Sequence, residues 1–535
     1  MQKPSIFARL GLVAGLAFLG SAAFAATATV DGVGGAATVD ATFPTSYATV
    51  GAALTAVQAA AGDHDIVITT AGPIDEPAGL RFNTAQVITV TGVSAGTVLR
   101  INATGIGVSG TTCAVVVAAQ AGTGVTLSNL IITPNTGTAG AVAARGLQVY
   151  TTATVDATVT LNNTMFTALD VPNSNAVVTN PFVAAYTTKA DRRANLRAFS
   201  GGGSTGVIEI RNDNSAGPGV LTVNLNRSGV THSILSADGA SGSGLNMSRT
   251  ANSVVNIGAG SFFTYNESNG IRTVGTMNTT TTAHNLNGTA ANPIVIAYNG
   301  WQEDSATLGR NEGILIDGPA TISHTLVLNN FRIGVIKVGG GTMAIQDSLI
   351  AYNQFDLDPS NGTAPNATSS ANVRQQGSGP LTITRSTLFD AQQANGGAIT
   401  WNSAAGSSIT TNDVVVAGGS DQVRADNAGG ARTFTDINSA FVEAGPVAMA
   451  SPTILLGTNV TRVTDGFAVT ADPDFASTTV SLTWGGLNGS TSVNADAFSV
   501  RSTAYRAARA VGAADVKGWN QASPLPVELS TFMLD

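Results

Sequence analysis

The sequence predicts an all-β solenoid, a chain wound into successive coils of short parallel strands. A phrase recurs in which two apolar residues flank a polar one, two or three small polar residues follow, and a second apolar run closes it. Ile322 and Ile345 in this phrase are 23 positions apart, and Ile383 and Ile409 are 26 apart. A repeat in the twenties written in short strands is typical of a β solenoid. The phrase occurs at 125–132, 159–166, 321–328, 343–350, 381–388 and 407–414.

The composition supports the same class. Hydrophobic residues make up 43% of the 535 residues, so a core can be buried. Charged residues make up only 11%, against about 25% in an average soluble domain. The apolar residues are mostly small or β-branched, which favours strands over helices. The net charge of −8 argues against nucleic acid or an anionic membrane surface as a partner.

The single cysteine, Cys113, excludes an internal disulfide. Its apolar neighbours Ala114 and Val115 predict a buried strand position. No base or cation stands next to it in the sequence, so we expect an unreactive thiol.

Residues 1–25 have the features of a secretory signal peptide. A basic start that includes Lys3 and Arg9 precedes an apolar stretch at 10–20, and Ala23-Phe24-Ala25 forms a small-x-small cleavage site. No later stretch approaches the roughly 18 apolar residues that a spanning helix needs, so we expect no membrane span in the mature chain. The sequence therefore predicts a secreted or cell-surface protein.

The first elements after the signal peptide are an extension and a helix. Residues 26–45 are expected to be flexible or to pair along a sheet edge. The spacing predicts a helix over 46–61, with Ser46 as a possible N-cap and with Val50, Ala53, Leu54 and Val57 on one face. His64 is expected in the turn that follows, and a strand opens at Ile66.

This opening resembles that of the right-handed parallel β-helix proteins of the pectin-lyase-like superfamily. The matching positions are Tyr47 to Leu54, Asp65 to Ile68, Glu76 and Leu80, whereas Gly72-Pro73-Ile74 matches only in part. The resemblance implies a right-handed solenoid in which the N-terminal helix caps the first coil. It also implies a secreted bacterial surface protein, and it is specific for architecture rather than for activity.

The predicted parallel β-helix with its cap spans 46–440. Residues 207–210, 221–225 and 254–257 are interpreted as further coils, and 358–379 as a surface loop. Residues 441–523 are expected to hold the final coils and a C-terminal cap, with a closing helix at 505–516. The Pro-rich tail at 524–535 resembles the linker that precedes C-terminal sorting domains. An antiparallel β-sandwich array is the competing fold, but it would show regular hairpin turns and no cap helix.

The candidate ligand-binding residues lie in the most polar and aromatic stretch of the chain. They are Tyr298, Trp301, Glu303, Asp304 and Arg310. The two aromatic rings suit stacking on a sugar, and the two carboxylates suit hydroxyl hydrogen bonds or Ca²⁺. A carboxylate pair also suits glycoside hydrolysis if suitably spaced. The alternative is an ordinary long turn without a ligand.

No catalytic residue and no metal site is predicted, and no cofactor is expected apart from a possible Ca²⁺. The four histidines, His64, His232, His284 and His324, have no metal-binding spacing. His324 is expected at an outward strand position. Asp356 and Asp358 form a second, weaker candidate for a cation.

Two functions remain open from the sequence. The first is a secreted or cell-surface β-helix protein with a structural, adhesive or carbohydrate-binding role, whose partners would be polysaccharides or other cell-surface components. The alternative is a polysaccharide lyase or glycoside hydrolase that acts on an acidic polysaccharide, with Glu303, Asp304 and Arg310 as its residues. An enzyme would bring acidic side chains of adjacent coils together beside a basic residue; scattered outward placement would favour a scaffold.

Overall fold

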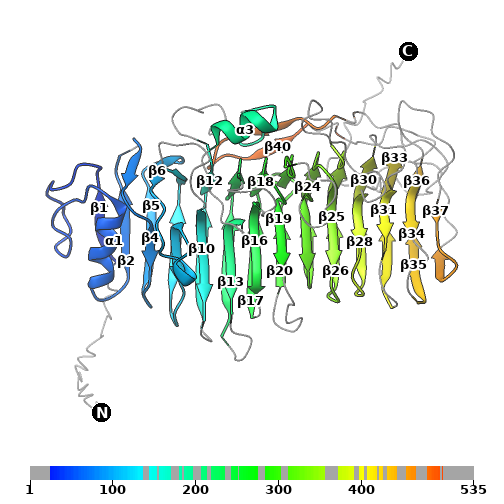
Figure 1. The fold of residues 1–535 in the computed structure, drawn as a ribbon, viewed down its shortest axis with the longest axis horizontal. Helices are drawn as coiled ribbons and strands as arrows, with labels where there is room; N and C mark the ends of the chain where they lie inside the picture. Colours follow the sequence, from blue (N-terminus) through cyan, green and yellow to red (C-terminus); the bar gives the residue numbers. More distant parts are fainter. Residues whose placement is uncertain are drawn as a thin grey trace, which may run out of the picture.

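Three long parallel sheets form the faces of one elongated β-helix, in which each coil contributes one strand to each sheet (Figure 1). The structure is a computed structural model. It describes residues 25–70, 72–135, 144–152, 156–169, 180–183, 186–196, 206–213, 219–234, 242–250, 252–274, 283–302, 311–355, 371–390, 397–402, 406–418, 421–425, 430–442, 454–464, 477, 479–494 and 497. The predicted signal peptide up to residue 24, the predicted closing helix at 505–516 and the predicted Pro-rich tail at 524–535 lie outside these residues.

We name the three sheets A, B and C in the order in which the chain visits them. Sheet A contains β1 (Ala26–Val30), β2 (His64–Ile68), β5 (Val87–Gly92), β8 (Gly124–Ser128), β11 (Ala157–Asn162), β14 (Leu221–Asn226), β17 (Ser253–Gly258), β20 (Ala283–Asn287), β23 (Ala320–Ser323), β26 (Met343–Gln346), β29 (Leu381–Thr384), β32 (Ser408–Asn412), β35 (Arg432–Ile437) and β38 (Val460–Thr464). Sheet B contains β3 (Ile74–Glu76), β6 (Thr97–Ile101), β9 (Leu130–Pro134), β12 (Met165–Thr167), β15 (Gly229–Thr231), β18 (Phe262–Thr264), β21 (Ile294–Ala297), β24 (Thr325–Leu328), β27 (Leu349–Ala351), β30 (Thr387–Asp390), β33 (Val415–Gly418) and β36 (Ala440–Val442). Sheet C contains β4 (Leu80–Phe82), β7 (Cys113–Ala118), β10 (Arg145–Thr151), β13 (Gly206–Asn212), β16 (Ser243–Thr250), β19 (Ile271–Val274), β22 (Ile314–Asp317), β25 (Ile333–Val338), β28 (Ala371–Gln375), β31 (Gly397–Trp401), β34 (Asp421–Ala425) and β37 (Ile454–Leu455).

The predicted fold, a right-handed parallel β-helix, is confirmed. Inward positions alternate with outward ones, so that on sheet A the side chains of Val125, Val159 and Val223 are buried and lie over one another in consecutive coils. Like side chains thus stack about 4.8 Å apart along the axis, which builds a continuous core.

The pairing register agrees with one predicted spacing and corrects the other. Ile322 pairs with Ile345, as the 23-residue spacing predicts. Ile383, however, pairs with Thr411, and Ile409 pairs with Leu381, so this coil has 28 residues rather than 26. Coil length varies because the loops between strands vary, whereas the inward alternation within each strand does not.

The N-terminal extension and helix lie where the sequence predicts them, but the N-cap of the helix is a different residue. The extension pairs along the sheet edge, since β1 runs parallel to β2 as the first strand of sheet A. The helix α1 (Val50–Ala59) lies at the N-terminal end of the solenoid and packs on β1, β2 and β4 (Figure 1). Its N-cap is Thr49, whose hydroxyl accepts a bond from Ala52 N at 3.1 Å, because the hydroxyl of Ser46 instead donates to Asp31. A capping role for the helix stays a prediction.

Glu76 connects α1 to sheet B. Its carboxylate accepts hydrogen bonds from the first helical amides, Val50 N at 2.5 Å and Gly51 N at 3.0 Å. An anion at a helix N-terminus interacts favourably with the helix dipole. Burial nevertheless raises the pKa of Glu76, with the two amide bonds acting in the opposite direction.

Several further predictions are tested by the described strands. The coils predicted at 207–210, 221–225 and 254–257 are present as β13, β14 and β17. The predicted surface loop 358–379 is wrong in part, because 371–375 form β28 between β25 and β31. His64 is the first residue of β2 and is buried beside the ring of Phe43, rather than in a turn. His324 lies between β23 and β24 with φ of 45°, a turn position rather than an outward strand position.

Part of the C-terminal region packs on the side of the solenoid. Two antiparallel strands, β39 (Leu482–Trp484) and β40 (Thr491–Val493), pack back on the outer face of sheet B near the middle of the solenoid (Figure 1). The ring of Trp484 lies 6.3 Å from that of Phe262, and Thr491 N donates to Asn292 Oδ1 at 3.1 Å. A C-terminal cap is therefore not what this hairpin forms, because sheet B presents an apolar outer face that the hairpin covers.

A column of five buried asparagines follows the turn between sheets B and C through four consecutive coils, and its last member lies in β28. Each side-chain amide donates to the Oδ1 of the next at 2.8–2.9 Å, and no member has an exposed surface. The members are Asn266, Asn299, Asn330, Asn353 and Asn372. Buried polar groups need hydrogen-bond partners. The asparagine side chains supply them to backbone amides and carbonyls that have no partner within the sheets.

Candidate functional site

The structure describes two of the five predicted ligand-binding residues. Tyr298 is a half-buried turn residue with φ of 57°, and its ring stacks on that of Tyr265 at 4.8 Å. Trp301 is completely buried, and its Nε1 donates to the carbonyl of Tyr265 at 2.9 Å. The ring of Trp301 therefore offers no exposed face to a sugar. Glu303, Asp304 and Arg310 lie outside the described residues.

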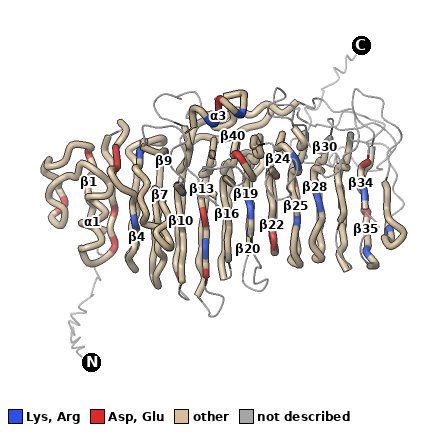
Figure 2. Tube along the Cα trace, in the orientation of Figure 1, with Lys and Arg blue, Asp and Glu red and all other residues tan. Residues whose placement is uncertain are grey.

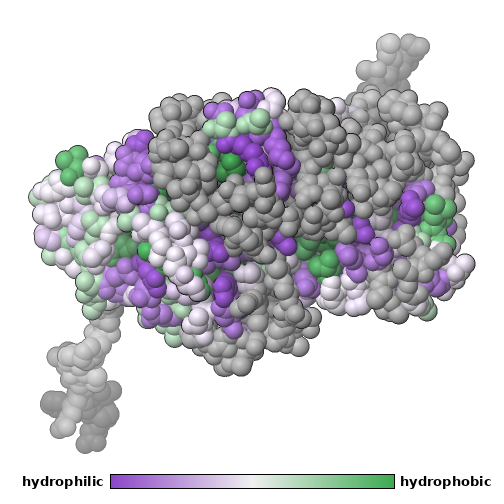
Figure 3. All heavy atoms as spheres, in the orientation of Figure 1, coloured by the Kyte–Doolittle hydropathy of each residue, from purple (hydrophilic) through white to green (hydrophobic). Residues whose placement is uncertain are grey.

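A short helix, α3 (Lys189–Asn195), packs over this turn (Figure 1). The guanidinium carbon of Arg192 lies 5.7 Å from the centre of the Trp301 ring, and Arg193 forms a 2.8 Å ion pair with the buried Glu267. Figure 3 shows hydrophilic residues gathered in this region of the described surface. The contacts stabilise the helix on the solenoid, which supports a structural role for the turn. Asp356 and Asp358, the weaker cation candidate, also lie outside the described residues.

The polar groups that the structure brings together lie instead on the outer face of sheet C. One outward position is in register through all twelve strands of this sheet, so its side chains form a single row along the solenoid. The row is Arg81, Val116, Gln148, Glu209, Asn246, Arg272, Leu315, Ile336, Arg374, Thr400, Arg424 and Leu455. We call it the sheet C row.

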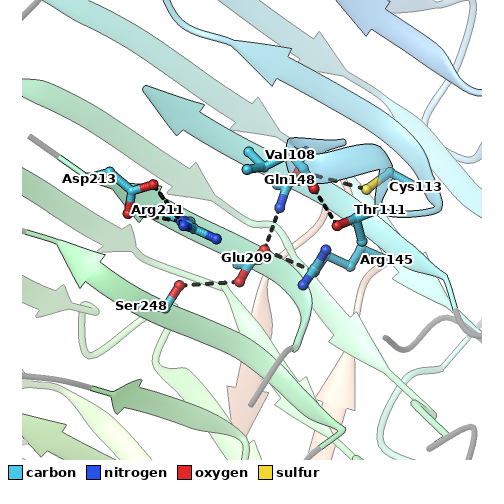
Figure 4. A network of polar contacts seen from close by, with 9 residues as sticks. All are labelled: Val108, Thr111, Cys113, Arg145, Gln148, Glu209, Arg211, Asp213 and Ser248. Carbon is cyan, nitrogen blue, oxygen red and sulfur yellow. Dashed lines mark hydrogen bonds and ion pairs between the residues drawn. The ribbon is translucent and has the colours of Figure 1, made fainter. Parts of the chain in front are cut away.

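Glu209 is the centre of a network within this row (Figure 4). Its Oε2 lies 2.9 Å from Arg145 Nε and accepts a 2.6 Å hydrogen bond from Gln148 Nε2. Its Oε1 accepts a bond from Ser248 Oγ at 3.2 Å. The backbone amide of Val108, in the short helix η1 (Val108–Gly110), donates to Gln148 and helps to bury it. The carboxylate is thus fully engaged, and Glu209 holds three coils together.

Cations that are exposed or half-buried lie on the same sheet beside and beyond the network. Arg81 is exposed and is held by bonds to the carbonyl of Ile106 at 2.7 Å and to the hydroxyl of Tyr150 at 3.1 Å. Arg211 contacts both carboxylate oxygens of Asp213, and this hydrogen bonding raises its pKa (Figure 4). Farther along the row, the side chain of Arg424 is 44% exposed and lies 3.9 Å from Asp421. Such positioned guanidinium groups suit carboxylate ligands.

Cys113 lies at the edge of the same network. Its thiol is buried and is 3.9 Å from Gln148 Oε1. Burial raises the pKa of the thiol to about 11, which exceeds the opposing effect of Arg145. The predicted buried strand residue is therefore confirmed, and its thiol is protonated at neutral pH.

Charge is divided unevenly among the three sheets (Figure 2). The strands of sheet C contain eight Lys or Arg and three Asp or Glu, a net charge of +5. The described strands of sheets A and B together contain three Lys or Arg and five Asp or Glu, a net charge of −2. The eight are Arg81, Arg145, Arg211, Arg249, Arg272, Lys337, Arg374 and Arg424. One sheet of an acidic protein is therefore cationic.

Lys337 differs from the other cations of the sheet because it is completely buried. Its ammonium group donates to the carbonyl of Gly339 at 3.2 Å. Burial lowers its pKa to about 8, although nearby Asp317 acts in the opposite direction. Lys337 pairs with the inward residues Ile316 and Gln375 of the neighbouring coils and does not reach the outer face. It contributes to the interior rather than to the sheet C row.

The network around Glu209 does not suit acid–base chemistry. Glu209, the carboxylate at the centre of the network, has its oxygens occupied by Arg145, Gln148 and Ser248. Within the described residues, no three His, Cys, Asp or Glu side chains lie close enough to hold a metal ion. A general acid or base needs a carboxylate that can approach the substrate, and Glu209 is 3% exposed.

The sheet C row was not predicted, because its members are far apart in the chain. Gln148 and Glu209, for example, are 61 positions apart. A signal was present nonetheless, since the third strand of several coils carries a cation directly after an apolar residue, as at Arg81, Arg272 and Arg424. Aligning those third strands with one another would have placed the three arginines in one column.

No protein-family model matches the chain, and no curated protein matches it. Among solved structures, pectate lyase Pel9A is 11% identical, with 89% of each chain covered and a TM-score of 0.38. The periplasmic alginate epimerase AlgG is 11% identical over 75% of this chain and 77% of its own, with a TM-score of 0.37. The A-module of Azotobacter vinelandii mannuronan C-5 epimerase AlgE6 is 13% identical over 79% and 96%, with a TM-score of 0.36. The function is therefore inferred from the residues of this chain.

Proposed function

We propose that the protein binds an anionic polysaccharide along the outer face of sheet C. The observation that carries this proposal is the excess of cations on sheet C, whose strands have a net charge of +5 in a protein of net charge −8 and which exposes Arg81 and Arg424 on its outer face. A surface lined by one sign of charge attracts ligands of the opposite sign. Most members of the sheet C row are buried, but Arg81 in β4 and Arg424 in β34 are exposed near opposite ends of the sheet. A linear polymer that follows the long axis can contact both, and weak contacts to one polymer then act together.

The exposed and the buried residues of this face have different roles. Arg81 and Arg424 are exposed and reach solvent from opposite parts of the row. Glu209, Arg145 and Gln148 are buried, and they hold adjacent strands in position rather than contacting the polymer. Arginine suits this purpose because its planar guanidinium group pairs with carboxylates through two parallel hydrogen bonds.

Binding to polygalacturonate, measured by titration calorimetry with the mature chain, tests the proposal. Binding should weaken as salt is raised, because exposed charges are screened over about 10 Å at 0.1 M ionic strength. The double variant Arg81→Ala/Arg424→Ala should bind about 2- to 30-fold more weakly, since an exposed ion pair contributes about 0.2–1 kcal/mol. Arg100→Ala is the matched control, because Arg100 lies on sheet B in an exposed pair with Asp75.

Three results would contradict the proposal. Equal binding of neutral dextran would show that charge does not drive recognition. Equal or tighter binding of double-stranded DNA would show that the ligand is not a polysaccharide. An equal loss in Arg100→Ala would show that sheet C has no special part. Release of reducing ends or unsaturated product from polygalacturonate would instead support the enzymatic alternative.

We also propose that the chain is secreted and that cleavage follows Ala25. The first strand begins at Ala26, so this cleavage would leave sheet A complete. Within the described residues, no helix is long and apolar enough to cross a membrane. N-terminal sequencing of the protein recovered outside the cytoplasm should begin at Ala26. A start within 27–30 would remove residues that pair with β2 and would contradict this processing.

A further inference from the structure

The outer face of sheet A has a different chemistry from that of sheet C. From β5 to β32, ten consecutive strands of this sheet contain no Lys, Arg, Asp or Glu. Their central outward position is in register and is half-buried throughout, open to solvent on one side. It holds Thr89, Thr126, Thr160, Asn224, Asn256, Asn285, Thr321, Ala344, Thr382 and Thr410.

A second outward column lies two residues farther along each strand and is also uncharged. It holds Thr91, Ser128, Asn162, Asn226, Gly258, Asn287, Ser323, Gln346, Thr384 and Asn412. Together the two columns form a plane of hydroxyl, amide and methyl groups. The plane repeats about every 4.8 Å along the solenoid.

The side chains of this plane are held in fixed orientations. Threonine is β-branched, which restricts its first side-chain torsion. The asparagines are bonded along the axis, since Asn256 Nδ2 donates to Asn224 Oδ1 and Asn285 Nδ2 donates to Asn256 Oδ1, each at 2.9 Å. A rigid periodic plane of this kind orders the water molecules that contact it, because its donors, acceptors and methyl groups recur at fixed intervals.

The composition of the plane limits what it can bind. Without charge it offers nothing to a charged ligand or to the anionic polymer proposed for sheet C. None of its outward positions in β5–β32 holds an aromatic ring, so it has no platform for stacking sugars. A partner that matches it must itself be flat, uncharged and periodic, and must accept and donate hydrogen bonds.

Ice meets all of these conditions, and we propose that the outer face of sheet A is an ice-binding surface. A groove of about 460 Å³ interrupts the plane near its N-terminal end, beside Thr126 and Thr222. The part from β20 to β32 lies outside that groove and provides the contact. This activity is separate from polysaccharide binding, because it uses the opposite chemistry on another sheet.

Thermal hysteresis and inhibition of ice recrystallisation, measured on the mature full chain, test the proposal. The native protein should give a hysteresis gap well above that of serum albumin at equal concentration. Thr382→Tyr/Thr410→Tyr should lower the gap at least threefold, because two bulky rings hold the plane away from the lattice. Thr55→Tyr is the matched control, because Thr55 is exposed on α1, and it should leave the gap unchanged.

A second variant distinguishes a loss of ice binding from a loss of folding. Thr382→Val/Thr410→Val keeps the shape and the strand preference while removing two hydroxyl groups, and it should lower the gap by a smaller factor. The absence of hysteresis in the native protein would overturn the proposal. An equal effect of Thr55→Tyr would also overturn it, as would binding to microcrystalline cellulose that the tyrosine variant abolishes while ice activity is absent.

Discussion

Replacing Asn330 by alanine is expected to destabilise the folded protein by about 3–5 kcal/mol, among the largest effects of a single substitution. The Oδ1 of Asn330 accepts bonds from both the amide N and the Nδ2 of Asn299, at 3.1 and 2.9 Å. Its Nδ2 donates to Ile296 O and to Asn353 Oδ1, at 3.2 and 2.8 Å. Alanine would leave these buried groups unsatisfied in the coils on either side.

The loss should appear as a lower denaturant midpoint in equilibrium unfolding followed by circular dichroism. Asn256→Ala is the matched control, because Asn256 lies on the solvent side of sheet A, and it should cost less than about 1 kcal/mol. Equal shifts for the two variants would show that the buried column does not stabilise the stack. Because solenoid stability is a sum over neighbouring repeats, a separate early transition in Asn330→Ala would also agree with local weakening.

Replacing Gly229 by alanine is expected to destabilise the protein by about 3 kcal/mol or more, through overpacking against the backbone. Gly229 lies on sheet B between Met165 and Phe262. A Cβ at this position would overlap the carbonyl oxygen of Phe262, and a strand in mid-stack cannot move away from its neighbour. Glycine is required here by close backbone approach rather than by an unusual φ.

Thermal unfolding of Gly229→Ala should show a clearly lower midpoint or a loss of soluble protein. Gly72→Ala serves for comparison, because a Cβ at Gly72 meets nothing nearer than 3.7 Å, and its effect should stay within about 0.5 kcal/mol. If both variants unfolded at the native midpoint, the register of β15 against β18 would be different from that described.

The fold was predictable because its signal is local. Inward residues alternate within single strands, as at Val159 and Leu161, and each short phrase shows this pattern without reference to the rest of the chain. The register was less predictable, since the pairing of Ile383 with Thr411 depends on loop length between strands. The return of the hairpin onto Phe262 was not predictable, because nothing near Trp484 in the sequence identifies that partner.

The candidate site was missed for a related physical reason. Aromatic and charged residues close together in sequence, such as Tyr298 and Trp301, suggested a surface loop, but the fold uses Trp301 to fill the space beneath α3. The sheet C row, in contrast, is assembled from one outward residue per coil. Such a row becomes visible only when the coils are aligned with one another, which requires the register.

The solenoid has a cationic face and an uncharged face, and the proposed anionic polysaccharide lies along the cationic face of sheet C. Hydrogen–deuterium exchange with and without polygalacturonate tests this most directly. We expect slower exchange in the segments around Arg81, Arg211 and Arg424, and unchanged exchange in β29 and β32 of sheet A. Protection confined to sheet A, or no protection at concentrations where binding is measured, would contradict the claim.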